Sequence, residues 1–402
     1  MSLQKNDACA LKERLKKINL IANANAALKA RLQEHKAASE LAYCQRKALR
    51  SGIKLPDYDA LSQALKGRLA QRGIRHVPKR KGDLHIFLTY ALNNWETVLP
   101  VALKPFGKVS EFEWCSHGFD STAANWLNRR GLMNEAMLAS FHEANSAEPI
   151  DIVVGYLSGD VCSPEILREM AQSGAVILNF CWDDKLGFRG KMRGGRWTGP
   201  VALASVVDLN LTNAPESRIK YLTEGGLAMF WPEAAHPGFH KPYDLPFEYD
   251  VSFVGGKYGW RPKLIEKLRK SGINVACFGN GWENGPLTDE EMIKLYSRSR
   301  INLGFAGVGH SRRLVCLKGR DFEVPMSGGL YLAQNNPDLS LVYDVGKEII
   351  TYQNENDCAQ KIRWLLAHPD EADAIRKAGR IRALRDHSWE KRFEDAFSLL
   401  YS

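Results

Sequence analysis

The alternation of short, β-rich apolar runs with helical patterns from Leu84 onward most constrains the fold of this chain. The strand-like runs form two groups. The first holds "LHIFLTY", "IDIVVGYL", "AVILNFCW" and "VDLNLTN", and the second holds "YDVSFVGG", "INVACFGN", "RINLGF" and "GGLYLAQ". Helix signals fall between the runs, such as Ser163-Pro164 and the capping pair Thr288 and Glu291. This pattern predicts an α/β protein with parallel sheets covered by helices.

A proline-rich segment separates the two groups of strands. The stretch "WPEAAHPGFHKPYDLPFEYD" contains four prolines, which exclude a helix or a central strand. The length of 402 residues also exceeds what one hydrophobic core usually organises. We therefore predict two Rossmann-like domains, residues 81–245 and a second beginning at 246. Because such sheets bind ligands at the carboxyl ends of their strands, we expect a cleft between the domains.

Composition excludes several classes of protein. No apolar run approaches the roughly eighteen residues of a membrane span, and the amino terminus lacks the apolar core of a secretory signal. A cytoplasmic location is the expectation. The eight cysteines are scattered without a C-x-x-C pair, which argues against a zinc site or a disulfide framework.

The positive charge is concentrated in residues 1–80, which hold 18 Lys and Arg against 6 Asp and Glu. Loosely helical apolar spacing predicts two helices here, broken near Ser51–Pro56. One interpretation is a basic helical extension that contacts anionic lipid headgroups or a partner protein. The other is an amphipathic segment packed on the main body. Nucleic-acid binding is not expected, because no recognition motif accompanies the charge.

A second basic region lies around "LKGRDFEVPMSGG". Residues 293–320 contain seven Lys and Arg and no acid, which favours an anion such as a phosphate group. Lys318 and Arg320 at the start of a short helix suit a diphosphate, and Glu323 suits the hydroxyls of a ribose. Gly328 and Gly329 permit close backbone approach. The alternative is a solvated surface on which Glu323 pairs with one of these cations.

Several stretches together resemble GT-B glycosyltransferases, especially the CgeB-like group. They include "SFVGGKYGWRPKLIEKL", "LKGRDFEVPMSGGLYLAQ", "GKEIITY" and "IRWLLAHPDEADAIRKAGRIRALRDHSWEKRF", so the resemblance spans roughly Val251 to Phe397. It implies two Rossmann-like domains facing a cleft, with the nucleotide-sugar donor in residues 246–385 and the acceptor in 81–245. A carboxy-terminal helix, 386–402, crosses back to the first domain. Neither a metal nor another cofactor is implied.

The resemblance also implies roles for individual residues. It places Gly255, Gly256 and Arg261 at the diphosphate, Gly279 and Trp282 beside the base, Glu323 on the ribose, and Lys318 and Arg320 at the leaving group. Cations there would stabilise the charge that grows on the departing phosphate. Arg261 has an alternative as a surface residue at a helix start, and Trp282 as a packing aromatic.

One departure from the family pattern concerns catalysis. Related retaining enzymes often carry a second Glu eight positions before the ribose-binding one, and here that position is Val315. An inverting mechanism would need a base from the acceptor domain. The candidates are Asp183, Asp184, His117 and Asp120. Turn capping is the alternative for the two adjacent aspartates, and a structural role is the alternative for His117.

The segment after these aspartates, "KLGFRGKMRGGRWTGP", is rich in Gly and basic residues. It is either a mobile lid that grips an anionic acceptor or a solvated loop. The expected activity is transfer of a sugar from a nucleotide diphosphate, with UDP as the commonest nucleotide, to a glycan, lipid-linked or protein acceptor. The alternatives are a non-catalytic glycosyltransferase-like binding or assembly protein, and a GT-B-fold epimerase or phosphorylase.

Overall fold

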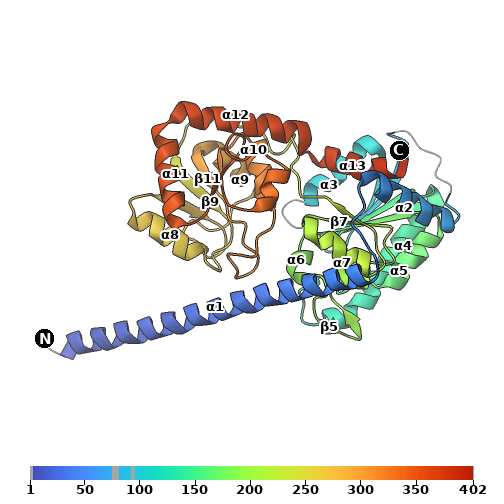
Figure 1. The fold of residues 1–402 in the computed structure, drawn as a ribbon, viewed down its shortest axis with the longest axis horizontal. Helices are drawn as coiled ribbons and strands as arrows, with labels where there is room; N and C mark the ends of the chain where they lie inside the picture. Colours follow the sequence, from blue (N-terminus) through green and yellow to red (C-terminus); the bar gives the residue numbers. More distant parts are fainter. Residues whose placement is uncertain (1–2, 75–80, 92–95, 402) are drawn as a thin grey trace.

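The computed structural model describes residues 3–74, 81–91 and 96–401, with the side chains of 3–24, 96 and 401 excepted. Two α/β bodies lie next to each other, and the long helix α1 (Leu3–Arg50) runs past both of them (Figure 1). Each body is built on one parallel sheet. This confirms the α/β class and the two facing Rossmann-like units predicted from the alternation of strands and helices.

The amino-terminal sheet has six parallel strands in the order β2-β1-β3-β4-β7-β8. Its strands are β1 (Leu84–Tyr90), β2 (Gly107–Glu113), β3 (Ile152–Gly155), β4 (Val176–Cys181), β7 (Leu209–Thr212) and β8 (Ala228–Phe230). The covering helices include α3 (Leu99–Leu103), α4 (Trp126–Ala147), α5 (Pro164–Gln172) and α7 (Arg218–Thr223). Alternate residues of β1 enter opposite cores, since Ile86 and Leu88 lie on one face and Phe87 on the other.

The carboxy-terminal sheet has five parallel strands in the order β10-β9-β11-β12-β13. Its strands are β9 (Tyr249–Val254), β10 (Val275–Phe278), β11 (Ser299–Leu303), β12 (Tyr331–Gln334) and β13 (Ile350–Tyr352). Its helices are α8 (Arg261–Lys270), α9 (Asp289–Arg298), α10 (Gly319–Met326), α11 (Glu355–Ala367) and α12 (Pro369–Asp386). The capping box of Thr288 and Glu291 is present as predicted.

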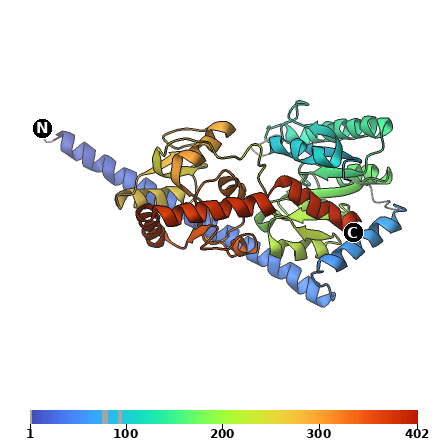
Figure 2. The same cartoon turned by 90° about the horizontal axis from the view of Figure 1, so that it is seen from above.

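Two crossings connect the bodies, and they pair with each other. The first crossing is the proline-rich segment after β8, and the second leads from α12 into α13 (Trp389–Tyr401), which returns to the amino-terminal body (Figure 2). The Ala235 N–H donates to the His387 carbonyl at 3.1 Å, and the Trp389 N–H donates to the Ala235 carbonyl at 3.0 Å. Trp389 and Phe393 then pack against Trp231 in the amino-terminal core.

The basic amino-terminal segment packs on the body. Helix α2 (Tyr58–Gln71) begins at the N-cap Asp57 and buries Leu61, Leu65 and Leu69 in the core that also holds β1 and α13. The break predicted near residues 51–56 falls between α1 and α2. Among the described residues, no helix combines the length and the apolar character needed to cross a membrane.

Helix α1 contacts both bodies. The Ser311 hydroxyl, in the carboxy-terminal body, donates to the Glu34 carboxylate at 2.6 Å. One and a half turns later, Glu40 forms an ion pair of 3.2 Å with Lys220 on α7 of the amino-terminal body. The helix therefore bridges the two bodies along one side (Figure 1).

Candidate active site

The carboxyl ends of the two sheets meet at a cleft, where Asn213 after β7 donates through its side chain to the Leu317 carbonyl at 3.3 Å. Lys318 and Arg320 begin α10 at this point, since the Lys318 N–H donates to the Asp321 carboxylate at 2.8 Å and caps the helix. Asp321 therefore satisfies one N–H at the start of α10, and the N–H groups of the turn that follows are the ones for which the sequence pattern predicts an anion site.

Three half-buried cations at the cleft form no direct ion pair. Within the described residues, none of Lys318, Arg320 and Arg261 forms an ion pair. Burial lowers the pKa of Arg261, and the nearby Arg320 lowers it further, so two guanidinium groups oppose each other. Arg261 is held in place by the Gly256 carbonyl at 3.0 Å and by the ring of Tyr258 at 4.1 Å. An anion between the two arginines would remove their repulsion.

Lys318 links the carboxy-terminal site to the opposite domain. Burial alone would lower the pKa of its ammonium group, but Cys316, Glu233 and Asp183 raise it above the usual value. Glu233 belongs to the proline-rich crossing, and Asp183 follows β4 of the amino-terminal sheet. Lys318 therefore lies within electrostatic reach of residues from three segments that are far apart in the sequence.

Two carboxylates meet above the backbone of Gly319. A Cβ atom at this glycine would lie 2.8 Å from Oε2 of Glu233 and 2.8 Å from Oε1 of Glu323. Both side chains are buried, and the hydroxyl of Tyr296 donates to Glu323 at 3.5 Å. Burial raises the pKa of Glu233 to about 8, with Glu323, Asp321 and Asp183 adding to the rise and Lys318 opposing it. Burial and the neighbouring carboxylates therefore favour the protonated form of Glu233.

Sequence reasoning missed Glu233. The residue stands in "WPEAAHPGF", where prolines indicate a linker and nothing in the spacing indicates a site. Its position depends on the pairing of Ala235 with the second crossing and on Trp231, whose indole N–H donates to the Arg392 carbonyl at 2.6 Å. A Glu beside the proline of an interdomain linker is the one signal that could have drawn attention to it.

The predicted glycines after β9 and β10 bring two loops together. Gly255 has φ of 150° and donates to the Phe278 carbonyl at 2.9 Å. A Cβ at Gly279 would lie 2.5 Å from the Gly255 carbonyl oxygen, so this contact requires a glycine. Gly255 and Gly256 lie beside Arg261, whose guanidinium group donates to the Gly256 carbonyl.

The other predicted donor residues make packing contacts. Trp282 is buried edge-on against Phe253, with ring centroids 6.1 Å apart, and belongs to the core under the sheet. Gly328 and Gly329 follow the opposite end of α10 from Lys318. A Cβ at Gly329 would lie 2.8 Å from the side chains of Asn302 and Val324, so the pair allows the turn from α10 into β12 to pack closely.

Of the predicted acceptor-side residues, Asp183 is at the cleft. It is exposed and lines a cavity of about 420 Å³ together with Tyr156, Ser158 and Thr198. Asp184 is fully buried at the start of α6 (Asp184–Gly187), where it accepts a hydrogen bond of 2.8 Å from the Tyr221 hydroxyl. Burial raises the pKa of Asp184 to about 6. The geometry thus separates one accessible carboxylate from one structural carboxylate.

His117 and Asp120 have local partners. His117 Nδ1 lies 2.9 Å from the Glu113 carbonyl, and its ring lies 4.3 Å from that of Phe112. Asp120 accepts from the N–H and the hydroxyl of Thr122, and these bonds lower its pKa. Neither residue is among the described side chains that line the cavity beside Asp183.

The Gly-rich basic segment after Asp184 contains a short antiparallel hairpin, β5 (Met192–Arg193) and β6 (Arg196–Trp197). Lys185 forms ion pairs with Glu216 at 2.6 Å and with Asp338, across the cleft, at 3.6 Å. Arg193 lies 3.9 Å from Asp160. Much of the positive charge of this segment is therefore balanced within the protein.

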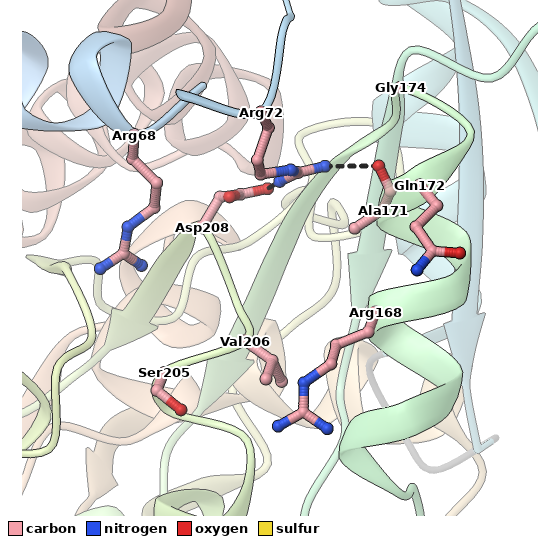
Figure 3. Close-up of a pocket in the computed structure, with 9 residues that line it drawn as sticks. All are labelled: Arg68, Arg72, Arg168, Ala171, Gln172, Gly174, Ser205, Val206 and Asp208. Carbon is pink, nitrogen blue, oxygen red and sulfur yellow. Dashed lines mark hydrogen bonds and ion pairs between the residues drawn. The ribbon is translucent and has the colours of Figure 1, made fainter. Parts of the chain in front are cut away.

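A separate cavity of about 590 Å³ (Figure 3) lies at the amino ends of β4 and β7, because Gly174 and Asp208, which line it, precede these strands. Asp183 follows the opposite, carboxyl end of β4. Arg72 there pairs with Asp208 and donates to the Ala171 and Ala175 carbonyls, while Arg68 donates to the Val207 carbonyl at 3.0 Å. These bonds anchor α2 to the sheet. In the part of the chain that is described, no group of three His, Cys, Asp or Glu could hold a metal ion.

Two facing parallel sheets with a returning carboxy-terminal helix define the GT-B fold, and solved structures bear this out. Sucrose-phosphate synthase from Thermosynechococcus elongatus superposes with a TM-score of 0.56 and 14% identity, covering 79% of this chain and 98% of that one. Anabaena HepE in complex with UDP-glucose gives 0.55 and 11%, covering 79% and 99%. An α-glucosyltransferase in complex with UDP and a 13-mer DNA gives 0.55 and 13%, covering 80% and 100%.

The family of the carboxy-terminal part is found by sequence as well. Residues 261–398 match the family described as glycosyl transferase-like. No curated protein matches the sequence. The chain is thus a GT-B-fold protein with a glycosyl transferase-like carboxy-terminal region, which confirms the resemblance to GT-B glycosyltransferases noted from its motifs.

Proposed function

We propose that this protein is a glycosyltransferase that moves a sugar from a nucleotide diphosphate, with UDP as the expected nucleotide, to a glycan, lipid-linked or protein acceptor. The observation that carries the proposal is the group of three cations, Lys318, Arg320 and Arg261, which face the cleft without an ion-pair partner among the described residues. A diphosphate would give these cations direct ion-pair partners. Glu323, buried beside them, would accept hydrogen bonds from the ribose hydroxyls.

In the proposed reaction, the bond between the anomeric carbon and the β-phosphate oxygen breaks, and its electron pair stays on the phosphate. Lys318 and Arg320 stabilise this growing charge. The acceptor oxygen forms the new bond and gives its proton to a base. Asp183 is the candidate base, because it is exposed in the acceptor-side cavity and lies close enough to Lys318 to influence its pKa.

The test is a panel of nucleotide sugars incubated with the full-length protein. Release of free nucleotide, slowly even to water, is expected with one of the UDP-sugars. The melting temperature should rise with the matching nucleotide, by an amount that corresponds to about 2.7 kcal/mol at a hundredfold excess over Kd. Binding without turnover would favour the non-catalytic binding or assembly protein, and conversion of the sugar to an isomer would favour the epimerase.

A pH dependence should identify the role of Glu233. Because its pKa is about 8, the side chain is neutral at pH 7 and ionises as the pH rises through 8. The ionised form repels a diphosphate, so the affinity for UDP-glucose is expected to fall between about pH 7 and 9. UDP-glucose is the suitable ligand, since its phosphates carry constant charge over this range. Glu233→Gln should give a flat profile by calorimetric titration.

The raised pKa of Glu233 also makes the free energy of unfolding depend on pH. A carboxyl group whose pKa is raised on folding holds a proton that the unfolded chain releases above about pH 4.3. Its contribution to stability is therefore full below that pH and declines as the pH rises toward 8. The exposed Glu290→Gln is the matched control and should keep the wild-type profile. Equal pH profiles for Glu233→Gln and the wild type would contradict the assignment.

The proposal also covers the limits of the domains and the location of the protein. We place the acceptor domain at 81–245, the donor domain at 246–385 and the returning helix at 386–402, with membership in the CgeB-like group. We propose a cytoplasmic location, and the positive charge of residues 1–80 supports a peripheral contact with anionic lipid. Salt-sensitive sedimentation with anionic vesicles is the measurement that bears on this contact.

A further inference from the structure

A cavity of about 720 Å³ lies between α1 and the carboxyl edge of the carboxy-terminal sheet. One wall is the face of α1 that carries Ala27, Arg31 and Glu34, and the other wall is the loop at 310–315 with residues that follow β12 and β13. Two hydrogen bonds link α1 to this loop. Gln33 accepts a hydrogen bond of 2.9 Å from the His310 N–H, and Glu34 accepts from Ser311.

The charge around this cavity is positive and partly unbalanced. Arg31, Arg312 and Arg313 line it, against the single carboxylate of Glu34. Arg312 pairs with Glu355 at 3.1 Å, but within the described residues the side chains of Arg31 and Arg313 have neither an ion pair nor a hydrogen bond. The buried Nδ1 of His310 is likewise without a hydrogen-bond partner. Unpaired cations that line one cavity favour an anionic ligand.

The uncharged polar residues that line the cavity indicate a second property of the ligand, which is the presence of hydroxyl groups. Asn335 and Gln353 are exposed at the carboxyl ends of β12 and β13, and both line the same cavity. Their side-chain amides offer donors and acceptors of the kind that bind sugar hydroxyls. Val315 also lines the cavity and lies three residues before Lys318, so the cavity adjoins the donor site along the chain.

We propose that this cavity binds an anionic sugar, the charged part of the acceptor, and that α1 forms one wall of the acceptor site. The inference rests on the proposed transferase function and specifies its substrate class. Arg31 and Arg313 bind the phosphate or carboxylate, and Asn335 and Gln353 bind hydroxyl groups. The basic amino-terminal extension then contributes to substrate recognition as well as to the bridge between the domains.

The test measures binding of glucose 6-phosphate, glucuronic acid and glucose to the full-length protein, by calorimetry with saturating UDP present. We expect at least one of the two anionic sugars to bind. Glucose, which is neutral, should bind at least about tenfold more weakly than that anionic sugar. The two anionic arms distinguish a phosphate from a carboxylate. Arg31→Glu and Arg313→Glu should each weaken the anionic sugar by about tenfold or more and leave the affinity for UDP unchanged.

A control variant distinguishes binding in the cavity from nonspecific attraction of an anion to the basic helix α1. Arg46→Glu changes the same helix by the same charge, and Arg46 is exposed away from the residues that line the cavity. Equal loss with Arg46→Glu, or absence of binding by both anionic sugars at millimolar concentration, would overturn the proposal. Loss of UDP binding in Arg31→Glu would also overturn it. A protein that binds the anionic sugar but not UDP would instead refute the proposed donor, so the two failures are distinguishable.

Discussion

Replacing Arg320 with Ala is expected to weaken UDP binding by roughly 10- to 150-fold, because a hydrogen bond to a charged group contributes about 1.5–3 kcal/mol. Lys318→Ala should have a loss of the same order. Uridine, which has no phosphate, should lose little in either variant. The reaction rate should fall further, by about a hundredfold or more, since these cations face the charge that develops on the leaving phosphate. Calorimetry with UDP and uridine, and release of nucleotide from the donor, measure these effects.

Two comparisons make this result specific. Arg385→Ala removes a surface guanidinium of α12 that pairs with the adjacent Asp386, and it should leave both affinities unchanged. Glu323→Gln should weaken UDP and uridine alike, and a 2′,3′-dideoxy nucleotide should be less sensitive to it, because the proposed partner is the ribose. Equal losses for UDP and uridine in Arg320→Ala would show that Arg320 does not contact the diphosphate.

Truncation of Leu65 to Ala is expected to destabilise the protein by about 2–5 kcal/mol, the range for large-to-small changes in a core. Leu65 on α2 is fully buried, between Leu61 and Leu69, in the core that also contains β1 and α13. Urea denaturation should show a lower midpoint at an unchanged slope. By the same reasoning, deletion of residues 1–75 should reduce the yield of folded protein, because it removes α2 from the core. It should not leave an intact donor-binding core.

The matched control for this change is Leu49→Ala. Leu49 also lies in the basic amino-terminal segment, but its side chain is 82% exposed. Its truncation should change the free energy of unfolding by no more than about 0.5 kcal/mol. If Leu65→Ala were as mild as Leu49→Ala, α2 would not be part of the core. UDP affinity should be normal in both variants, because neither residue is near α10.

Local features of the chain were predictable because they depend on neighbours in sequence. The eight apolar runs become strands, since a buried strand in a parallel sheet needs a short, continuous apolar segment. The start of α9 follows from Thr288 and Glu291, and the start of α10 places Lys318 and Arg320 at a cleft-facing helix end. Strands β2, β8 and β13 of the two parallel sheets, and the short hairpin strands β5 and β6, were not predicted. The sequence of β2, "GKVSEFE", is polar because it lies at the sheet edge.

The charges of residues 293–320 show where prediction from sequence stops. The absence of acids predicted a region that favours an anion throughout, but Arg298 and Arg300 pair with Glu248 and Asp250, at the end of the proline-rich segment. Arg312 pairs with Glu355 on α11. Lys318 and Arg320, by contrast, form no ion pair in the described residues. Which cations stay available for a ligand depends on the acids that folding brings beside them.

The sequence by itself determined the parallel α/β architecture, the proline-rich connection between the two groups of strands and the cationic start of α10, because hydrophobic period, proline and helix caps act over a few residues. The tertiary structure alone decided that Glu233 from the linker meets Glu323 over Gly319, that Asp183 is accessible while Asp184 is buried, and that α1 walls a basic cavity. These outcomes depend on contacts between segments far apart in the chain, and local residue patterns carry no information about the distance between such segments.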